Sequence, residues 1–282
     1  MKYNFDEVID RSNSDSTKWG NLVELYGDKD ILPLWIADMD FKSSNEIIQA
    51  FKDRAEHGVF GYAYRSDSFY NAIINWVKKR FNWEIKKEWI LFIPGVVMGL
   101  NIGVRELVKE GENVLVQPPV YPPFFRVLDN NNRVANSNPL KHNGVKFVMD
   151  YEDLERRAPG TKLMMLCNPQ NPVGRVWTKE ELTRLGDICI KNDITIISDE
   201  IHCDFTLKGF KHTPMASISK ELEQRTITLM APSKTFNIAG LVTSVAIIPN
   251  EELRNIYQRA IEVLLYLVHW ALKLLIIMAK NG

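Results

Sequence analysis

One lysine in this chain has both the residue type and the setting for covalent chemistry. Lys234 lies in the run SKTFNIAG, four residues after the predicted strand Thr226–Met230, and its neighbours are small or polar. A lysine in a cleft of this kind can lose its proton and attack a carbonyl carbon. The alternative is a solvated surface lysine, which is the commoner environment of any single lysine.

A carboxylate closes another apolar run. Asp199 stands at the start of the sequence DEIH, directly after the predicted strand Ile194–Ser198. A carboxylate at the end of a buried strand is costly unless it is paired, and a protonated ring nitrogen would be a suitable partner. The alternative is that Asp199 caps the next segment. His202, three residues later, could tune the same site or pack against the edge of the sheet.

A glycine between a strand and a helix is a candidate for binding phosphate. Gly95 follows the predicted strand Ile90–Ile93 and begins a predicted helix, so free backbone N–H groups would face a strand end. Such groups bind phosphate with help from the helix dipole. The motif is not G-x-G-x-x-G, so a dinucleotide is not implied. Taken alone, Gly95 fits equally a plain turn that needs glycine for its backbone angles.

Two proline-rich loops add an aromatic ring and an amide. Tyr121 lies in PPVYPPF, where the prolines fix the direction of the ring, and a flat cofactor could stack on it. The alternative is an aromatic plug beneath the loop. Asn171 lies in NPQNPVG, where its amide could donate a hydrogen bond to a ring hydroxyl or a carboxylate, although such loops are often only turns.

Five predicted strands deliver these residues, and in an open parallel sheet the carboxyl ends of the strands border the ligand site. A single small molecule would use all of them. Pyridoxal phosphate (PLP) has a phosphate, an aromatic ring, a ring hydroxyl, a basic ring nitrogen and an aldehyde that requires a lysine. The order and placement of the residues therefore favour PLP over any of the separate alternatives.

The elements that must position these residues alternate between short apolar runs and helical patterns, which indicates an α/β fold with a mostly parallel sheet flanked by helices. The predicted strands are Ile90–Ile93, Asn113–Gln117, Lys162–Cys167, Ile194–Ser198, Thr226–Met230 and Thr243–Ile248. The predicted helices are Asn45–His57, Ser68–Phe81, Val96–Lys109, Lys179–Asn192 and one from Glu251 onward. We expect an N-terminal arm over residues 1–40, a cofactor-binding large domain over 41–262 and an apolar tail over 263–282.

The bulk properties exclude several classes of protein. Lys and Arg total 35, as do Asp and Glu, so no charge excess indicates nucleic acid or an anionic membrane as partner. The three cysteines are widely spaced, which argues against a zinc site or a disulfide framework and for a reducing compartment. The N-terminus has no apolar run of the kind found in signal peptides. We therefore expect a cytoplasmic protein without a bound metal.

The loops PPVYPPF, NPQNPVG, SDEIH and APSKTFNIAGL resemble those of fold-type I aminotransferases of class I/II. The stretches WIADMDF, VFGYAYR and SDEIHCDF narrow the resemblance to the MalY/PatB-type C–S β-lyases, also called cystathionine β-lyases. The match covers residues 3–262, and as a set the motifs are specific. The resemblance implies the fold-type I large domain and PLP as the cofactor.

The same match implies a role for each candidate. Lys234 would hold PLP covalently and act as the base. Asp199 would pair with the pyridine nitrogen, Asn171 would bond the ring hydroxyl and Tyr121 would stack on the ring, with His202 beside them. Four residues would hold the phosphate: Gly95, Val96, Val97 and Ser233.

Three further features follow from the resemblance. Tyr62 matches a tyrosine that reaches the phosphate of the neighbouring subunit, which implies a homodimer. The residues expected to border the substrate are Trp35, Ala37 and Asp38. Val242 stands eight residues after Lys234, where many aminotransferases have a phosphate-binding arginine, so that contact is not expected here.

The implied activity is β-elimination from cystathionine or a related L-cysteine thioether, in which Lys234 removes the Cα proton and a thiol, pyruvate and ammonia are released. Two alternatives stay open. A class I/II transaminase would use the same residues, and a non-enzymatic protein could keep the fold and act through partners.

The last part of the sequence departs from the family pattern. Residues 263–279 read VLLYLVHWALKLLIIMA, which is apolar nearly all round and slightly short for a membrane span of about 20 residues. We interpret this as a frameshifted end that replaces the family's C-terminal small domain, with a membrane anchor and a partner-binding helix as alternatives. On that interpretation the small domain is missing, and we expect the chain to be weakly active at best.

Overall fold

The computed structural model describes residues 3–12 and 14–262, which divide into two compact units. Of the described residues, unit 1 comprises 3–12, 14–63 and 232–242, and unit 2 comprises 64–231 and 243–262. The apolar tail at 263–282 lies outside the described residues, so its interpretation stays a prediction, as does the domain boundary after residue 40. Among the described helices, none is both long enough and apolar enough to cross a membrane.

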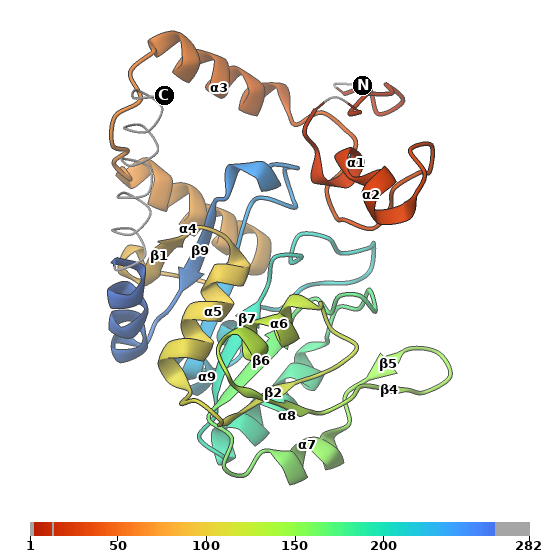
Figure 1. Ribbon diagram of the computed structural model, residues 1–282. Helices are drawn as coiled ribbons and strands as arrows, with labels where there is room; N and C mark the ends of the chain where they lie inside the picture. Colours follow the sequence, from red (N-terminus) through yellow and green to blue (C-terminus); the bar gives the residue numbers. More distant parts are fainter. Residues whose placement is uncertain (1–2, 13, 263–282) are drawn as a thin grey trace. The chain divides into compact units, whose positions relative to one another are not determined.

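Unit 2 is built on a seven-stranded sheet in the order β1-β9-β8-β7-β6-β2-β3. Figure 1 labels β1, β9, β7, β6 and β2 of this sheet. The strands are β1 (Ile90–Ile93), β2 (Asn113–Val116), β3 (Val134–Ser137), β6 (Leu163–Cys167), β7 (Thr195–Asp199), β8 (Thr226–Met230) and β9 (Ser244–Ile247). Strand β9 is antiparallel to both of its neighbours, β8 and β1, and the other pairs are parallel. The carboxyl ends of β1, β2, β6, β7 and β8 therefore lie at one edge, and the predicted α/β fold with a mostly parallel sheet is confirmed.

Both faces of the central sheet are buried. Along β6, Leu163, Met165 and Cys167 join one apolar cluster, whereas Met164 and Leu166 join the other, as the two-residue period of a strand requires. The first cluster is covered by α5 (Val96–Leu107), α6 (Pro123–Asn130) and the helical residues 251–262. The second is covered by α7 (Tyr151–Arg157), α8 (Lys179–Lys191), the short helix η2 (Met215–Ser217) and α9 (Lys220–Arg225). Near-continuous apolar strands are expected in a sheet that is covered on both faces.

Helix α5 packs closely on the sheet at two buried glycines, where no space remains for a side chain. A methyl group on Gly103 would stand 2.1 Å from a side-chain carbon of Ile197 and 2.2 Å from the hydroxyl of Tyr257. One on Gly99 would stand 2.7 Å from Ile93. The Tyr257 hydroxyl donates a hydrogen bond to the Gly99 carbonyl, so the helix is held in this close position.

A third cluster closes the β1 end of the sheet, where α4 (Asp67–Phe81) contributes Val77 and Phe81. The remaining elements of unit 2 are the short helix η1 (Lys87–Trp89) and a separate hairpin of β4 (Lys141–His142) and β5 (Phe147–Val148). Helix α8 begins with the capping box formed by Thr178 and Glu181, in which each side chain accepts a hydrogen bond from the backbone of the other residue. The helices predicted near α4, α5 and α8 agree with the structure to within two residues.

Unit 1 has few regular elements. They are α1 (Thr17–Gly20), α2 (Leu22–Tyr26), α3 (Asn45–His57) and the short helix η3 (Ala239–Leu241). Helix α3 begins where the Ser44 side chain accepts a hydrogen bond from the Ile47 amide, and it ends at Gly58 in the left-handed conformation. A turn over 232–237 precedes η3 and carries Lys234.

Candidate functional site

Asp199 is the last residue of β7 and is only 5% exposed. One of its carboxylate oxygens accepts a hydrogen bond from the Ile201 amide at 3.1 Å, so the local capping role considered from the sequence is present. Its backbone carbonyl accepts a hydrogen bond from the Asn168 amide at 2.9 Å, which ties the end of β7 to the loop after β6. A carboxylate held in this way at a dry sheet edge suits a cationic partner.

The residue next to Asp199 is a buried glutamate, Glu200, for which the sequence predicted no role. Glu200 is fully buried, and its carboxylate accepts hydrogen bonds from the Ser198 hydroxyl at 2.8 Å and the Met215 amide at 3.0 Å. It also lies 2.8 Å from Nε2 of the buried His212. These contacts satisfy a charge that would otherwise be costly to bury, and they fix the chain on either side of Asp199.

Tyr121 lies in the loop between β2 and α6, with 39% of its surface exposed. Burial of the other part, and secondly the negative charge of Asp199, raise the pKa of Tyr121 above its ordinary value. The phenol therefore stays protonated at neutral pH, and its ring face remains partly open for a flat ligand.

The loop after β6 brings Asn171 to the same edge. The Asn171 amide N–H donates to the sulfur of Cys167 at 3.3 Å, while no described residue hydrogen-bonds the side-chain amide of Asn171. The thiol of Cys167 in turn donates to the Pro169 carbonyl at 3.2 Å. The backbone of Asn171 is thus fixed and its side chain is available to a ligand.

Gln170 links the loops of Asn171 and Tyr121, a role that the sequence did not indicate. Its buried side-chain amide donates to the carbonyl oxygens of Gln117 at 3.0 Å and Pro119 at 2.8 Å. Both acceptors belong to the loop that leads to Tyr121. One amide therefore holds the two ligand-facing loops at a constant spacing.

We expect Gln170→Met, which keeps the length of the side chain but removes both donors, to lower the free energy of unfolding by about 1–3 kcal/mol, because the buried Gln117 carbonyl and the partly buried Pro119 carbonyl lose their partner. We also expect PLP to bind about tenfold more weakly, a loss of about 1.4 kcal/mol. Denaturant unfolding and cofactor titration measure the two effects.

Gln117→Met is the matched control for this substitution. It removes the hydrogen bond from the Gln117 side chain to Asn138 in the same region but leaves the link to the Asn171 loop intact. Equal loss of PLP affinity in the two variants would contradict a bracing role for Gln170.

The start of α5 supplies amide groups at the sheet edge. Gly95 has φ of 106°, a backbone conformation that residues with a side chain rarely adopt. Its N–H donates to the Ser244 hydroxyl at 2.7 Å. Ser244 passes the interaction on to the Ile93 carbonyl at 2.9 Å. The Gly95 amide is therefore occupied, while the N–H groups of Val96 and Val97 belong to the first turn of α5, where backbone donors lack intrahelical acceptors.

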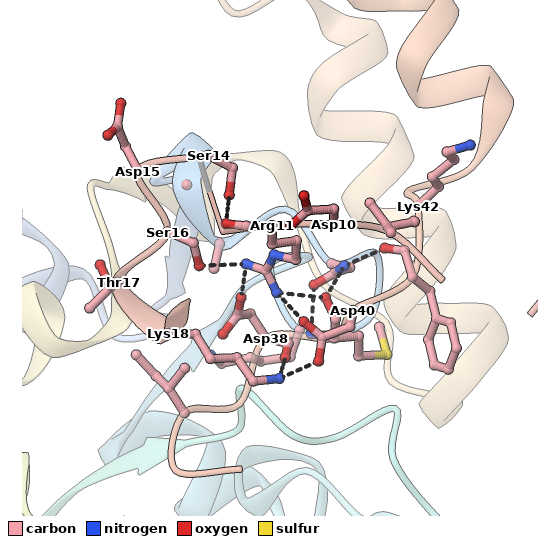
Figure 2. Close-up of a pocket in the computed structure, with 18 residues that line it drawn as sticks. Asp10, Arg11, Ser14, Asp15, Ser16, Thr17, Lys18, Asp38, Asp40 and Lys42 are labelled. Carbon is pink, nitrogen blue, oxygen red and sulfur yellow. Dashed lines mark hydrogen bonds and ion pairs between the residues drawn. The ribbon is translucent and has the colours of Figure 1, made fainter. Parts of the chain in front are cut away.

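In unit 1, Lys234 lines a cavity of about 640 Å³ together with residues of two segments, 9–18 and 36–42. Figure 2 shows this cavity and the side chains around it. No hydrogen bond or ion pair within the described part of the chain engages the Lys234 amine. Ser233, beside it, accepts a hydrogen bond at its carbonyl from the Ile238 amide. The amine of Lys234 is thus free for chemistry.

Three residues were expected to border the substrate, and of these Asp38 lines the cavity whereas Trp35 and Ala37 do not. Ile36, which was not expected, also lines it. The Asp38 carboxylate pairs with Arg11 at 2.5 Å. The Trp35 indole N–H donates to the Lys18 carbonyl at 3.4 Å. Trp35 therefore contacts Lys18, a residue of the cavity wall, without lining the cavity itself.

The remaining predicted residues have varied settings. Tyr62 is 87% exposed. His202 is half-buried, with its ring centre 6.2 Å from that of Phe205. Val242 has φ of 48°, which is rare for a β-branched residue and costs roughly 1–2 kcal/mol. Its apolar side chain supplies no positive charge eight residues after Lys234, where many aminotransferases have an arginine.

Comparison with known proteins places these features in a family. Residues 29–271 match the family described as aminotransferase class I and II. The cystathionine β-lyase PatB of Bacillus subtilis is 44% identical over 88% of this chain, and the match covers 64% of PatB. The chain thus spans less than two thirds of the length of that relative.

Two solved structures are similar in fold. Cystalysin from Treponema denticola, which contains PLP, superposes with a TM-score of 0.90 at 36% identity, covering 93% of this chain and 68% of cystalysin. The PLP-bound C–S lyase from Staphylococcus hominis gives a TM-score of 0.85 at 34% identity, covering 92% and 66%.

Proposed function

This chain belongs to the class I and II aminotransferase family, and on that premise we propose that it is a PLP-dependent C–S β-lyase. Its substrates would be cystathionine or related L-cysteine thioethers, and its products a thiol, pyruvate and ammonia. The similarity to the cystathionine β-lyase PatB and to a C–S lyase of known structure supports this choice over transamination.

The observation that carries the proposal is the set of ligand-facing groups at the carboxyl edge of the sheet in unit 2. It combines the buried carboxylate of Asp199, the unengaged amide of Asn171, the half-exposed ring of Tyr121 and the free amides at the start of α5. These groups match a ring nitrogen, a ring hydroxyl, a ring face and a phosphate, which are the parts of PLP other than its aldehyde.

The aldehyde requires an amine, and Lys234 has one that no described residue engages. Bound PLP supplies an electron sink for the charge that develops at Cα of an amino acid. Asp199 would keep the ring nitrogen protonated, and Tyr121 would fix the plane of the ring. Asn171 would donate to the ring oxygen, and the amides of Val96 and Val97, together with the Ser233 hydroxyl, would hold the phosphate.

Lys234 has a second task as the general base. With PLP and an amino acid bound, the Lys234 amine would take the proton from Cα, and the electron pair left behind would expel the sulfur from Cβ as a thiolate. The sulfur takes up a proton, and water releases the remaining three-carbon fragment as pyruvate and ammonia. The mass of the substrate and one water thus equals that of the products.

A direct assay tests the proposal. We expect the purified chain, supplied with PLP and cystathionine, to release pyruvate without any added keto acid. A transaminase would release no pyruvate under these conditions, and a protein that keeps only the fold would show no cofactor absorbance.

We further propose that the active form is a two-fold dimer and that it works in the cytoplasm. The exposed Tyr62 would serve the phosphate in the neighbouring subunit, as its resemblance implies. Cys167, Cys189 and Cys203 are all free thiols in the interior, which suits a reducing compartment.

Subunit mixing tests the shared site. Lys234→Ala chains and Tyr62→Phe chains should each be inactive alone, yet random pairing should restore about a quarter of full activity, because half of the dimers hold one intact site of two. Mixing Lys234→Ala with Asp199→Asn is the control, since both residues serve the same site and no intact site can form. Absence of recovery in the first mixture, with subunit exchange verified by mass, would exclude a shared site.

A further inference from the structure

Two residues that are not among the proposed cofactor contacts link the N-terminal segment, residues 9–12 and 14–19, to the turn that carries Lys234. We propose that Asp40 and Asn237 are positioning residues, which fix the Lys234 turn against residues 9–12 and 14–19 and so determine where the lysine amine lies in its cavity. The structural link stands on contacts within unit 1, and its effect on catalysis rests on the function proposed above.

Asp40 is the centre of the charged cluster in Figure 2. Its carboxylate accepts hydrogen bonds from Arg11 at 2.6 Å, Lys18 at 2.6 Å and the indole of Trp19 at 2.9 Å. The Lys18 amine also donates to the carbonyl of Asp38 at 3.0 Å. Three donors from the N-terminal segment therefore meet on one side chain of the segment 36–42.

The negative charge of Asp40 is needed because its partner Lys18 is buried, with 4% of the Lys18 side chain exposed. An unpaired ammonium group in that setting would be costly. Burial acts to raise the pKa of Asp40, but the hydrogen bonds from Lys18, Trp19 and Arg11 outweigh it and lower the pKa to about 2. Asp40 therefore stays charged throughout the pH range in which an enzyme of this kind works.

Asn237 joins the same segment to the lysine turn. Its side-chain oxygen accepts a hydrogen bond from the Met39 amide at 2.9 Å, and its side-chain N–H groups donate to the carbonyls of Met39 at 2.9 Å and Phe41 at 2.8 Å. The Ser43 hydroxyl adds a contact to the Asn237 carbonyl at 3.1 Å. All three polar positions of the Asn237 amide are thus used to hold the backbone on either side of Asp40.

The route from the N-terminal segment to the lysine is short and continuous. Asp40 lies between Met39 and Phe41, which Asn237 grips, and Asn237 lies three residues after Lys234 in the same turn. Asn237 also has φ of 54°, so a residue that tolerates the left-handed region is needed there. A base that must reach a Cα proton depends on orientation, and a misplacement of about 1 Å can cost about 100-fold in rate.

The test compares Asp40→Asn, which removes the charge at constant shape, with Asn237→Gly, which removes the amide but accepts the backbone angle. Matched controls in unit 2 are Asp153→Asn, at another carboxylate with several donors, and Asn132→Gly, at another asparagine with φ of 54°. The first measurement is hydrogen exchange of the whole chain without PLP. The second is kcat and KM for cystathionine with PLP present.

We expect exchange at residues 9–12, 14–19 and 233–238 to rise at least tenfold in both variants, while amides of the sheet in unit 2 keep their protection. We expect kcat to fall about 10- to 100-fold with a smaller change in KM, because orientation of the base is lost rather than substrate binding. Neither control should show these changes. Unaltered exchange at 233–238 in Asn237→Gly would overturn the proposal even if Asp40→Asn does not fold.

The two measurements separate the two proposals. If hydrogen exchange in both variants equals that of the unaltered chain, the structural link is refuted, whatever the value of kcat. Altered exchange with an unchanged kcat removes the positioning role. Altered exchange in a chain that binds no PLP leaves the link in place and refutes the proposed function instead.

Discussion

Replacing Lys234 with alanine is expected to abolish covalent attachment of PLP and to lower β-lyase turnover by about 100- to 10,000-fold, because the chain would lose its proposed nucleophile and general base together. In the unaltered chain, borohydride should reduce the link to the cofactor and fix it on the peptide that contains Lys234. Mass spectrometry after digestion identifies the labelled peptide, and pyruvate release measures the turnover.

Lys42 offers a matched control because it lines the same cavity and is paired with Glu7. Lys42→Ala should keep the labelled peptide and most of the activity. Labelling of a lysine other than Lys234 in the unaltered chain would remove the basis for the assignment.

The second large effect is expected at Asp199. Asp199→Asn keeps the shape of the side chain and its acceptor for the Ile201 amide, but it removes the negative charge. If Asp199 pairs with the ring nitrogen as proposed, that nitrogen would lose its proton in the variant, the electron sink would weaken, and exchange of the Cα proton should slow by about 100-fold or more. Part of the PLP should remain bound through the other contacts.

Proton exchange is measured by incorporation of deuterium into an amino acid that binds but does not eliminate. Asp187→Asn, at an exposed position of α8, is the control and should exchange at the rate of the unaltered chain. Wild-type exchange in Asp199→Asn would show that the carboxylate does not serve the ring nitrogen.

Local sequence was sufficient to predict the strands that carry the candidate residues. Runs such as Leu163–Cys167 and Thr226–Met230 are apolar throughout because both faces of the sheet are covered, and their loops stand out by proline and glycine. The direction of β9 could not be predicted in the same way. Whether a strand runs parallel or antiparallel depends on the connection that brings it to its neighbour, and its own composition is the same in both cases.

The supporting residues escaped notice for a different physical reason. Gln170, Glu200 and His212 are buried polar groups, and their partners are backbone atoms or side chains up to 53 positions away. No periodic pattern marks such a residue, because its role is defined by contacts that exist only after folding. Edge strand β3 was missed since VANS is half polar and only partly buried, so it lacks the apolar run by which the other strands were found.

The close approach of α5 to the sheet has a consequence for attempts to make this protein more robust. Exchanging glycine for alanine within a helix is a common route to higher thermal tolerance, with a gain of about 1 kcal/mol from helix propensity. At Gly99 and Gly103 the added methyl would instead push the helix outward, away from Ile93 and Ile197. The amides of Val96 and Val97 lie in the first turn of the same helix. An outward shift of the helix would therefore move them away from the edge of the sheet. Substitutions chosen by helix propensity alone at these two positions are therefore expected to weaken the proposed phosphate binding without raising thermal stability.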